Sequence, residues 1–216
     1  MKSNVYLLIA LLGVASPLFA QTNYVSTAPA QSSPGADNTL VGVGAGNLNM
    51  SGASNLFIGR GTGAQNMAGT QNVFVGASAG NLNTSGQGNS FVGYQAGYSN
   101  QSGNNNTFLG SGAGYTNGTG FSNLFIGQRA GYFNAGGSNN AFMGTGAGYA
   151  NTSGSDNTFV GSDAGAANTS GVSNVAFGSL AGSSNTTGRA NVSIGVWRYR
   201  RNPSCPCGRS QARSSA

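Results

Sequence analysis

A unit of seventeen residues repeats along this chain without an insertion or a deletion. Each unit begins with a glycine and carries an asparagine three residues later. The leading glycines are Gly35, Gly52, Gly69, Gly86, Gly103, Gly120, Gly137, Gly154, Gly171 and Gly188. A fixed period of this length is typical of solenoids, in which each unit buries its apolar face on its neighbours. The period therefore restricts the possible folds more than any other feature of the sequence.

Numbered from its leading glycine, the unit reads G-x-x-N-x-F-h-G-x-x-A-G-x-x-N-x-S/T, where h is an aliphatic residue. Three glycines per unit disfavour a helix, because each costs roughly 1 kcal/mol relative to alanine. The apolar residues also lack the i, i+3, i+4 spacing of a helix. The segment N-x-F-h-G has the length of one strand, and we expect Gly and Asn, which tolerate positive φ, at the corners. The sequence predicts an all-β fold, a parallel β-solenoid (β-roll) of nine to ten coils over residues 35–195.

Position 6 of most units is phenylalanine, and position 7 is usually aliphatic. Neighbouring residues of a strand point to opposite faces, so one of the two lines the inside of the coil and the other lies outside. A long apolar ladder on the outside normally marks an interaction surface, and we expect it to pack against copies of the same chain. The predicted core and interface residues are Phe57, Phe74, Phe91, Phe108, Phe125, Phe142, Phe159, Ile58, Val75, Leu109 and Ile126.

The asparagines at positions 4 and 15 should form columns along the stack, like the Asn ladders of cross-β assemblies. Their amides are suited to backbone groups at the corners, and a structural role is favoured over contact with a ligand. Tyr98, Tyr115, Tyr132 and Tyr149 share position 13 in four consecutive units and should form a second, aromatic column. Packing between coils explains this column, and the alternative is an exposed contact strip for a glycan or a protein.

The distribution of charge argues against nucleic acid as a partner. The sequence pI is about 9.8, but residues 35–195 contain only Arg60, Arg129 and Arg189 against Asp37, Asp156 and Asp163. The repeats are therefore neutral and offer no electrostatic footprint for phosphate. They contain no histidine and no glutamate, hence no nucleophile–base pair, and no regularly repeated aspartate for calcium. We expect a protein that is not an enzyme and that needs no metal or cofactor.

The N-terminus has the pattern of a secretory signal, with Lys2, an apolar run over residues 5–14, and cleavage expected after Ala20. We expect residues 1–20 to be the signal peptide, residues 21–34 a flexible lead-in and residues 196–216 a basic, irregular tail. The tail breaks the period and contains Cys205 and Cys207, which alone make a poor metal site. We interpret it as a truncated or frame-shifted end. The signal pattern predicts that the mature chain is secreted or at the cell surface. No run is long enough to cross a bilayer, so no integral membrane segment is expected in the mature chain.

The segments N-T-F-L-G at 106–110, A-G-Y at 113–115 and N-L-F-I-G-Q-R-A-G-Y at 123–132 resemble the head repeats of trimeric autotransporter adhesins. They are more similar still to the related repeats of bacterial tail-fibre-like surface proteins. The resemblance covers residues 35–195 and is specific for the class of repeat, not for a ligand. It implies a left-handed parallel β-roll that assembles as a homotrimer and acts in adhesion.

Together these features predict an exported structural or adhesive surface protein, whose repeat head attaches to cells, matrix or surfaces. Its partners would be further copies of the chain and a glycan or protein of the host or surface. The alternative is a soluble binding module that presents a flat polar face of Asn, Ser and Thr to a glycan or another repeating ligand.

Overall fold

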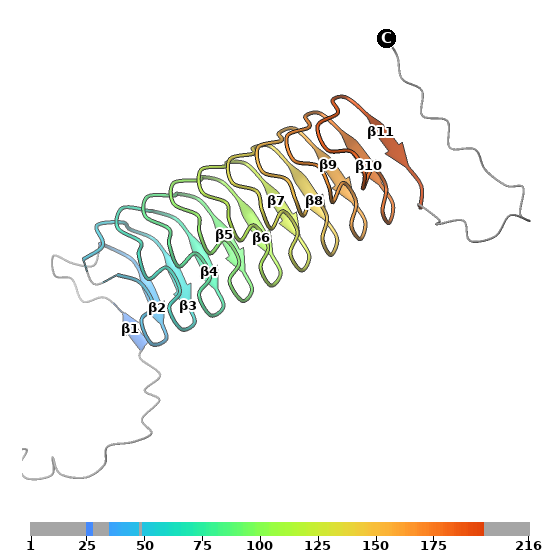
Figure 1. The fold of residues 1–216 in the computed structure, drawn as a ribbon. Coiled ribbons are helices and arrows are strands. Elements are labelled where there is room, and N and C mark those ends of the chain that lie inside the picture. The colour runs from blue at the N-terminus through green and yellow to red at the C-terminus, as the bar shows by residue number, and fades with distance from the viewer. Residues whose placement is uncertain (1–24, 28–34, 48, 197–216) are drawn as a thin grey trace, which may run out of the picture.

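The computed structural model describes residues 25–27, 35–47 and 49–196 of the chain. These residues form a rod of stacked coils with one three-residue strand per coil (Figure 1). The strands are β1 (Val25–Thr27), β2 (Thr39–Val41), β3 (Leu56–Ile58), β4 (Val73–Val75), β5 (Ser90–Val92), β6 (Thr107–Leu109), β7 (Leu124–Ile126), β8 (Ala141–Met143), β9 (Thr158–Val160), β10 (Val175–Phe177) and β11 (Val192–Ile194). The predicted all-β parallel solenoid, with about nine turns of about seventeen residues, is confirmed.

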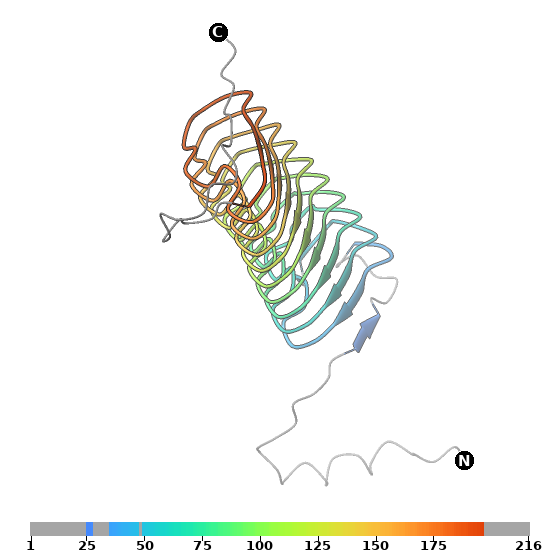
Figure 2. The same cartoon turned by 90° about the vertical axis from the view of Figure 1, so that its right-hand side faces the viewer.

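All eleven strands belong to one sheet, in which they follow one another in chain order. The sheet occupies one side of the rod (Figure 2). From β2 to β11 the pairing is parallel, and each residue lies beside its equivalent seventeen positions away; Phe91, for example, pairs with Phe108. Because the register equals the sequence period, every position of the unit becomes a column along the rod.

Hydrogen bonds join the coils outside the sheet as well. The amide of Gly114 donates to the carbonyl of Ala130 (2.9 Å), and the amide of Ser122 donates to the carbonyl of Asn104 (2.9 Å). The turns thus satisfy their backbone groups on the neighbouring coils, as backbone removed from water must. The solenoid is therefore bonded from coil to coil around its perimeter and not only at the strands.

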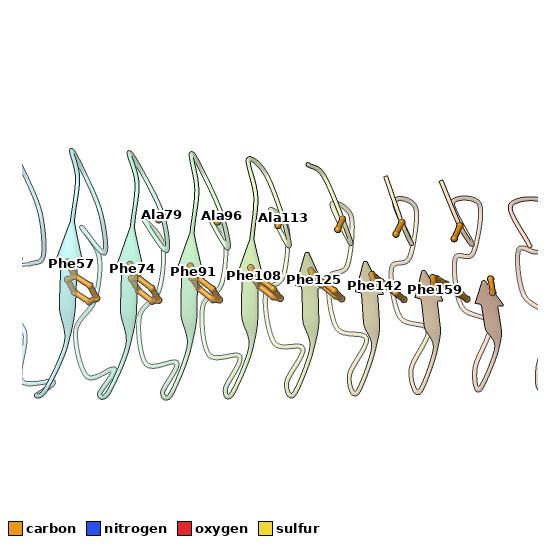
Figure 3. Close-up of a cluster of buried hydrophobic side chains, with 14 of the residues drawn as sticks. Phe57, Phe74, Ala79, Phe91, Ala96, Phe108, Ala113, Phe125, Phe142 and Phe159 are labelled. Carbon is orange, nitrogen blue, oxygen red and sulfur yellow. The ribbon is translucent and has the colours of Figure 1, made fainter. Parts of the chain in front are cut away.

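The core is a single column of phenylalanine rings inside the rod (Figure 3). Phe57, Phe74, Phe91, Phe108, Phe125, Phe142 and Phe159 are fully or almost fully buried. Successive rings stack nearly parallel, with centroids 4.7–4.9 Å apart, which is the spacing between strands. Alanines at position 11, such as Ala79, Ala96 and Ala113, close the core from the opposite wall of the coil. Each buried ring contributes roughly 1.5–3 kcal/mol through removal of its surface from water.

Two of the repeated glycines are required by geometry. Coil 5, residues 103–119 when the coil that begins at Gly35 is coil 1, shows both. At position 8, Gly110 has a φ of +136°, and a Cβ there would lie 2.5 Å from the carbonyl oxygen of Gly127. At position 12, Gly114 has a φ of +59° and lies under the Phe108 ring, whose Cδ2 would be 2.5 Å from a Cβ. Any other residue would meet both backbone strain and a collision at either position.

The expectation of positive φ holds for the glycines at positions 8 and 12 but not for the repeated asparagines. Apart from the glycines, positive φ falls on positions 3 and 10, which carry varied residues such as Asp37, Gln71, Arg129 and Leu180. The asparagine side chains are buried and hydrogen-bonded, and this need, not the backbone conformation, accounts for their repetition.

The two ends of the rod differ. At the N-terminal end, β1 pairs with β2 in antiparallel orientation and covers the edge of the sheet, with Ser26 opposite Leu40. Covered edges protect a sheet from pairing with other chains. At the C-terminal end, the phenylalanine column gives way to Ala176 and then Ser193. Among β2 to β11 the last strand is the most exposed, because no described coil stacks on it, and Ile194 shows 74% of its surface to solvent.

Several predictions fall on parts of the chain outside the described residues. They are the signal peptide (1–20), the tail from residue 197 onward with its two cysteines, and all of the lead-in except β1. These stay predictions, as do the left-handed winding of the coil and the trimer.

Candidate functional site

The first asparagine column, at position 4, runs unbroken from Asn38 to Asn191. Each side-chain oxygen accepts two bonds from the next asparagine: the amide of Asn106 donates to Oδ1 of Asn89 (2.9 Å), and so does its Nδ2 (3.2 Å). Nδ2 of Asn106 also donates to the carbonyl of Gly120 (2.8 Å). The column thus uses every hydrogen-bonding atom of the side chain inside the rod.

The second asparagine column, at position 15, is shorter than the period predicts. It extends from Asn66 to Asn168 through side-chain bonds of 2.6–2.8 Å. In the first coil Asn49 is exposed, and Met50 is buried beside Asn66 instead. In the ninth coil Asn185 bonds with Gly188, so the buried Oδ1 of Asn168 has no partner. The column therefore ends before the strands do.

Both columns meet at the leading glycine. The carbonyl of Gly86 accepts from Nδ2 of Asn72 (2.8 Å) and from Nδ2 of Asn83 (3.2 Å). A Cβ on Gly86 would lie 2.5 Å from the carbonyl oxygen of Gly103 and 2.6 Å from Nδ2 of Asn100. The leading glycine is thus required by close approach of the next coil, and the buried asparagines of the two columns are not available to a ligand.

The predicted interface residues Ile58, Val75, Leu109 and Ile126 lie on the outer face of the sheet, opposite the phenylalanines. They belong to a column that we call the outer strip: Val41, Ile58, Val75, Val92, Leu109, Ile126, Met143, Val160, Phe177 and Ile194. Its members are half-buried or exposed, and Leu109 shows 47% of its surface. The strip is therefore a continuous apolar surface along the rod.

The four tyrosines at position 13 form the predicted column, hereafter the tyrosine column. Tyr98, Tyr115 and Tyr132 stack at 4.9–5.1 Å with planes within 6°. Tyr149 is set slightly apart, at 5.5 Å and 20° from Tyr132. Phe133 packs edge-on against the rings of Tyr132 and Tyr149 at this end of the column. The rings are half-buried, so they pack between coils and still present surface to solvent.

Within the column, burial raises the pKa of the Tyr115 phenol above its ordinary value of 10.0. The neighbouring phenols of Tyr132, Tyr98 and Tyr94 raise it further, because a second phenolate would be repelled. Tyr115 therefore holds its proton at neutral pH and can donate a hydrogen bond at the surface.

A surface hollow of about 250 Å³ opens at the end of the tyrosine column. It is lined by Gln128, Arg129, Thr145, Gly146, Tyr149 and Asp163. The Arg129 guanidinium lies over the Tyr132 ring, 5.9 Å from its centroid. Sequence reasoning missed this hollow. The signal was the alanine at residue 166, which ends the run of tyrosines at position 13 near an arginine and an aspartate.

The described part of the chain holds no group of three or more His, Cys, Asp or Glu side chains placed to bind a metal ion. Nor does any helix in it have the length and apolar character needed to cross a membrane. The columns of buried and exposed side chains are instead those of a scaffold that repeats one surface along its length.

These features define the class of the protein: a β-solenoid repeat protein with coils of about seventeen residues and an asparagine ladder. Comparison with models of known families, with curated proteins and with solved structures finds no match to the chain.

Proposed function

We propose that this chain is an exported structural or adhesive surface protein whose solenoids assemble as homotrimers through the outer strip. The trimer and the adhesive role follow the adhesin heads and tail-fibre-like proteins that the units resemble. The observation that carries the proposal is the outer strip, which is apolar in every coil from Val41 to Ile194.

The composition of the sheet's outer face supports association. Residues at positions 5 and 7 point outward on both sides of each buried residue, and none of these residues in β2 to β11 is charged. Contiguous apolar patches of this length are rare on monomers, and interface cores are depleted in charge. A flat strip of aliphatic side chains with a fixed spacing is suited to packing against an identical strip.

The rest of the surface suits a role in attachment. The rod is neutral over residues 35–195 and presents the same short loops along its length. A repeated surface can bind several sites on a target at once, which raises the overall affinity without strong individual contacts. The expected signal peptide would deliver such a rod to the outside of the cell.

The oligomeric state of residues 21–216 tests the proposal, measured by light scattering coupled to size-exclusion chromatography. The wild type should have three times the mass of one chain. Leu109→Lys, which places a charge on the outer strip, should reduce that mass. Ser111→Lys, an exposed position in the same coil outside the sheet, should leave it unchanged. A folded monomeric wild type would contradict the proposal and favour the soluble binding module.

The adhesive role has a separate test, in which beads coated with the purified protein are allowed to settle on cells and on extracellular matrix. Attachment above that of beads coated with albumin is expected. A stable trimer that leaves the beads unattached to both targets would limit the function to a structural one.

A further inference from the structure

The hollow at the end of the tyrosine column lies where a fifth tyrosine would be. In coil 6 the ring of Tyr132 covers Gly112 of the preceding coil, and its Cε2 lies 3.3 Å from where a Cβ of that glycine would be. The residue in the same relation to Gly146 is Ala166, whose methyl group is too short to cover it. The hollow above Gly146 is therefore a gap of one ring at the end of an aromatic stack.

Polar side chains border this gap on both sides. Arg129 and Asp163 occupy position 10 in coils 6 and 8, and Gly146 occupies the same position between them. A side chain on Gly146 would collide with Oδ1 of Asp163, so the glycine keeps the floor open. The other carboxylate oxygen, Oδ2, accepts from the hydroxyl of Ser162 (3.3 Å). Oδ1 is thus left to face the hollow.

The chemistry of the border indicates the kind of ligand. The guanidinium of Arg129 offers donors only, the carboxylate of Asp163 acceptors only, and the side chains of Gln128 and Thr145 offer both. The two formal charges cancel, so the hollow selects neither anions nor cations. The Tyr149 ring adds an apolar wall, and a few polar groups around an apolar wall are the usual composition of a small-molecule site.

We propose that the hollow binds one pyranose ring of a neutral carbohydrate. The apolar face of the sugar stacks on Tyr149 in place of the missing tyrosine, and its hydroxyl groups bond with Asp163, Arg129 and Thr145. A phosphate group would be repelled by Asp163, and a purely apolar ring would leave the polar border without partners at a cost in affinity. The inference rests on the proposed adhesive role for its purpose, since it names the class of target that the rod would attach to.

The test is saturation-transfer NMR of the chain from residue 21 with the methyl glycosides of glucose, galactose, mannose and N-acetylglucosamine. At least one glycoside should receive magnetisation from the wild type. Ala166→Tyr, which supplies the missing ring, should abolish the signal while the circular dichroism spectrum stays that of the wild type. Asp163→Asn should weaken binding about tenfold through loss of the charged acceptor.

Two matched control variants test whether binding takes place at the hollow. Asp156→Asn removes an exposed carboxylate from the same coil, and Tyr98→Ala shortens the tyrosine column at its other end; both should bind as the wild type does. The inference is overturned if none of the four glycosides gives a signal, or if Ala166→Tyr still binds as the wild type does. Either result leaves the oligomer mass unaffected, so the proposed assembly is judged separately.

Discussion

The side-chain oxygen of Asn89 accepts two hydrogen bonds from Asn106, one from its backbone amide (2.9 Å) and one from its Nδ2 (3.2 Å). The same pair of bonds recurs at every step from Asn38 to Asn191, at 2.9–3.0 Å and 3.0–3.2 Å. A single side-chain type thus fixes both the turn of each coil and its register with the next.

Replacement of Asn106 by alanine tests the value of this column. The amide and Nδ2 of Asn123 would both lose their acceptor inside the rod. Buried groups without partners cost about 1–3 kcal/mol each, so the free energy of unfolding should fall by about 2–5 kcal/mol in urea titrations. The control Asn104→Ala removes an exposed asparagine of the same coil and should cost less than about 1 kcal/mol. Equal costs for the two variants would contradict a structural role for the ladder.

Phe108→Asp should unfold the solenoid or dissociate the assembly, because it places a carboxylate in the fully buried ring column. Phe108→Ala should lower stability by about 3–5 kcal/mol through the cavity it leaves. Ser111→Asp places a charge at an exposed position of the same coil outside the sheet and should leave both the fold and the assembly unchanged. Melting temperature and oligomer mass report the outcome, and if Phe108→Asp leaves both unchanged, Phe108 is not in a core.

The glycines of one coil should differ sharply in their tolerance of a methyl group. Gly110→Ala meets a φ of +136° and the carbonyl of Gly127, and strain of this kind costs on the order of 1–3 kcal/mol before the collision is counted. Gly118→Ala meets no atom closer than 3.5 Å and should be neutral or stabilising by up to about 1 kcal/mol. Chemical denaturation compares the two. A cost of Gly118→Ala equal to that of Gly110→Ala would show that the description of these turns is wrong.

The tyrosine column predicts a loss of stability at high pH. Because the folded-state pKa of Tyr115 is raised above its ordinary value of 10.0, the unfolded chain releases this proton first as the pH rises. The contribution of Tyr115 is therefore complete below pH 10.0 and is lost as the pH rises through the folded-state pKa. Melting curves between pH 8 and pH 11.5 should show this decline, and Tyr115→Phe should reduce it. An identical decline in the variant would exclude Tyr115 as the source.

Export can be tested at the N-terminus of the secreted product. Expression of the full chain in a bacterial host should yield a mature protein that begins at Gln21, identified by mass spectrometry. Retention of residues 1–20 on exported protein would contradict the predicted signal peptide.

The period made most of the fold predictable. Once Phe91 must pair with Phe108, the strands, the inward ring column and the outward aliphatic strip follow from the alternation of side chains along a strand. The asparagine columns were predictable as well, although their φ angles were not. A consensus that repeats Asn does not reveal whether the backbone or the amide requires it.

The features that break the period could not be predicted from it. Strand β1 is antiparallel and belongs to no unit. In the first coil Met50 is buried where later coils bury an asparagine, and this occurs only there, where no earlier coil constrains the turn. The hollow depends on Ala166, a small residue that follows tyrosines at the same position in the four preceding coils. Its effect becomes visible only by comparison with Tyr132, whose ring covers Gly112. The seventeen-residue period thus predicts the scaffold, and the candidate carbohydrate site lies where the sequence departs from that period.

The stacking of coils in register is tested most directly by distances between pairs of spin labels. Cys205 and Cys207 are first replaced by serine, and labels are attached to cysteines introduced at exposed, equivalent positions of different coils. Positions 77 and 162 (Ala77 and Ser162) lie five coils apart, and positions 43 and 162 (Val43 and Ser162) lie seven coils apart. The labelled chain is mixed with an excess of unlabelled chain, so that only pairs within one chain report. At about 4.8 Å per coil, pulsed electron paramagnetic resonance should then give narrow distributions near 24 Å and 34 Å. Broad distributions, or two distances that do not differ by about 10 Å, would contradict the solenoid and every function argued from it.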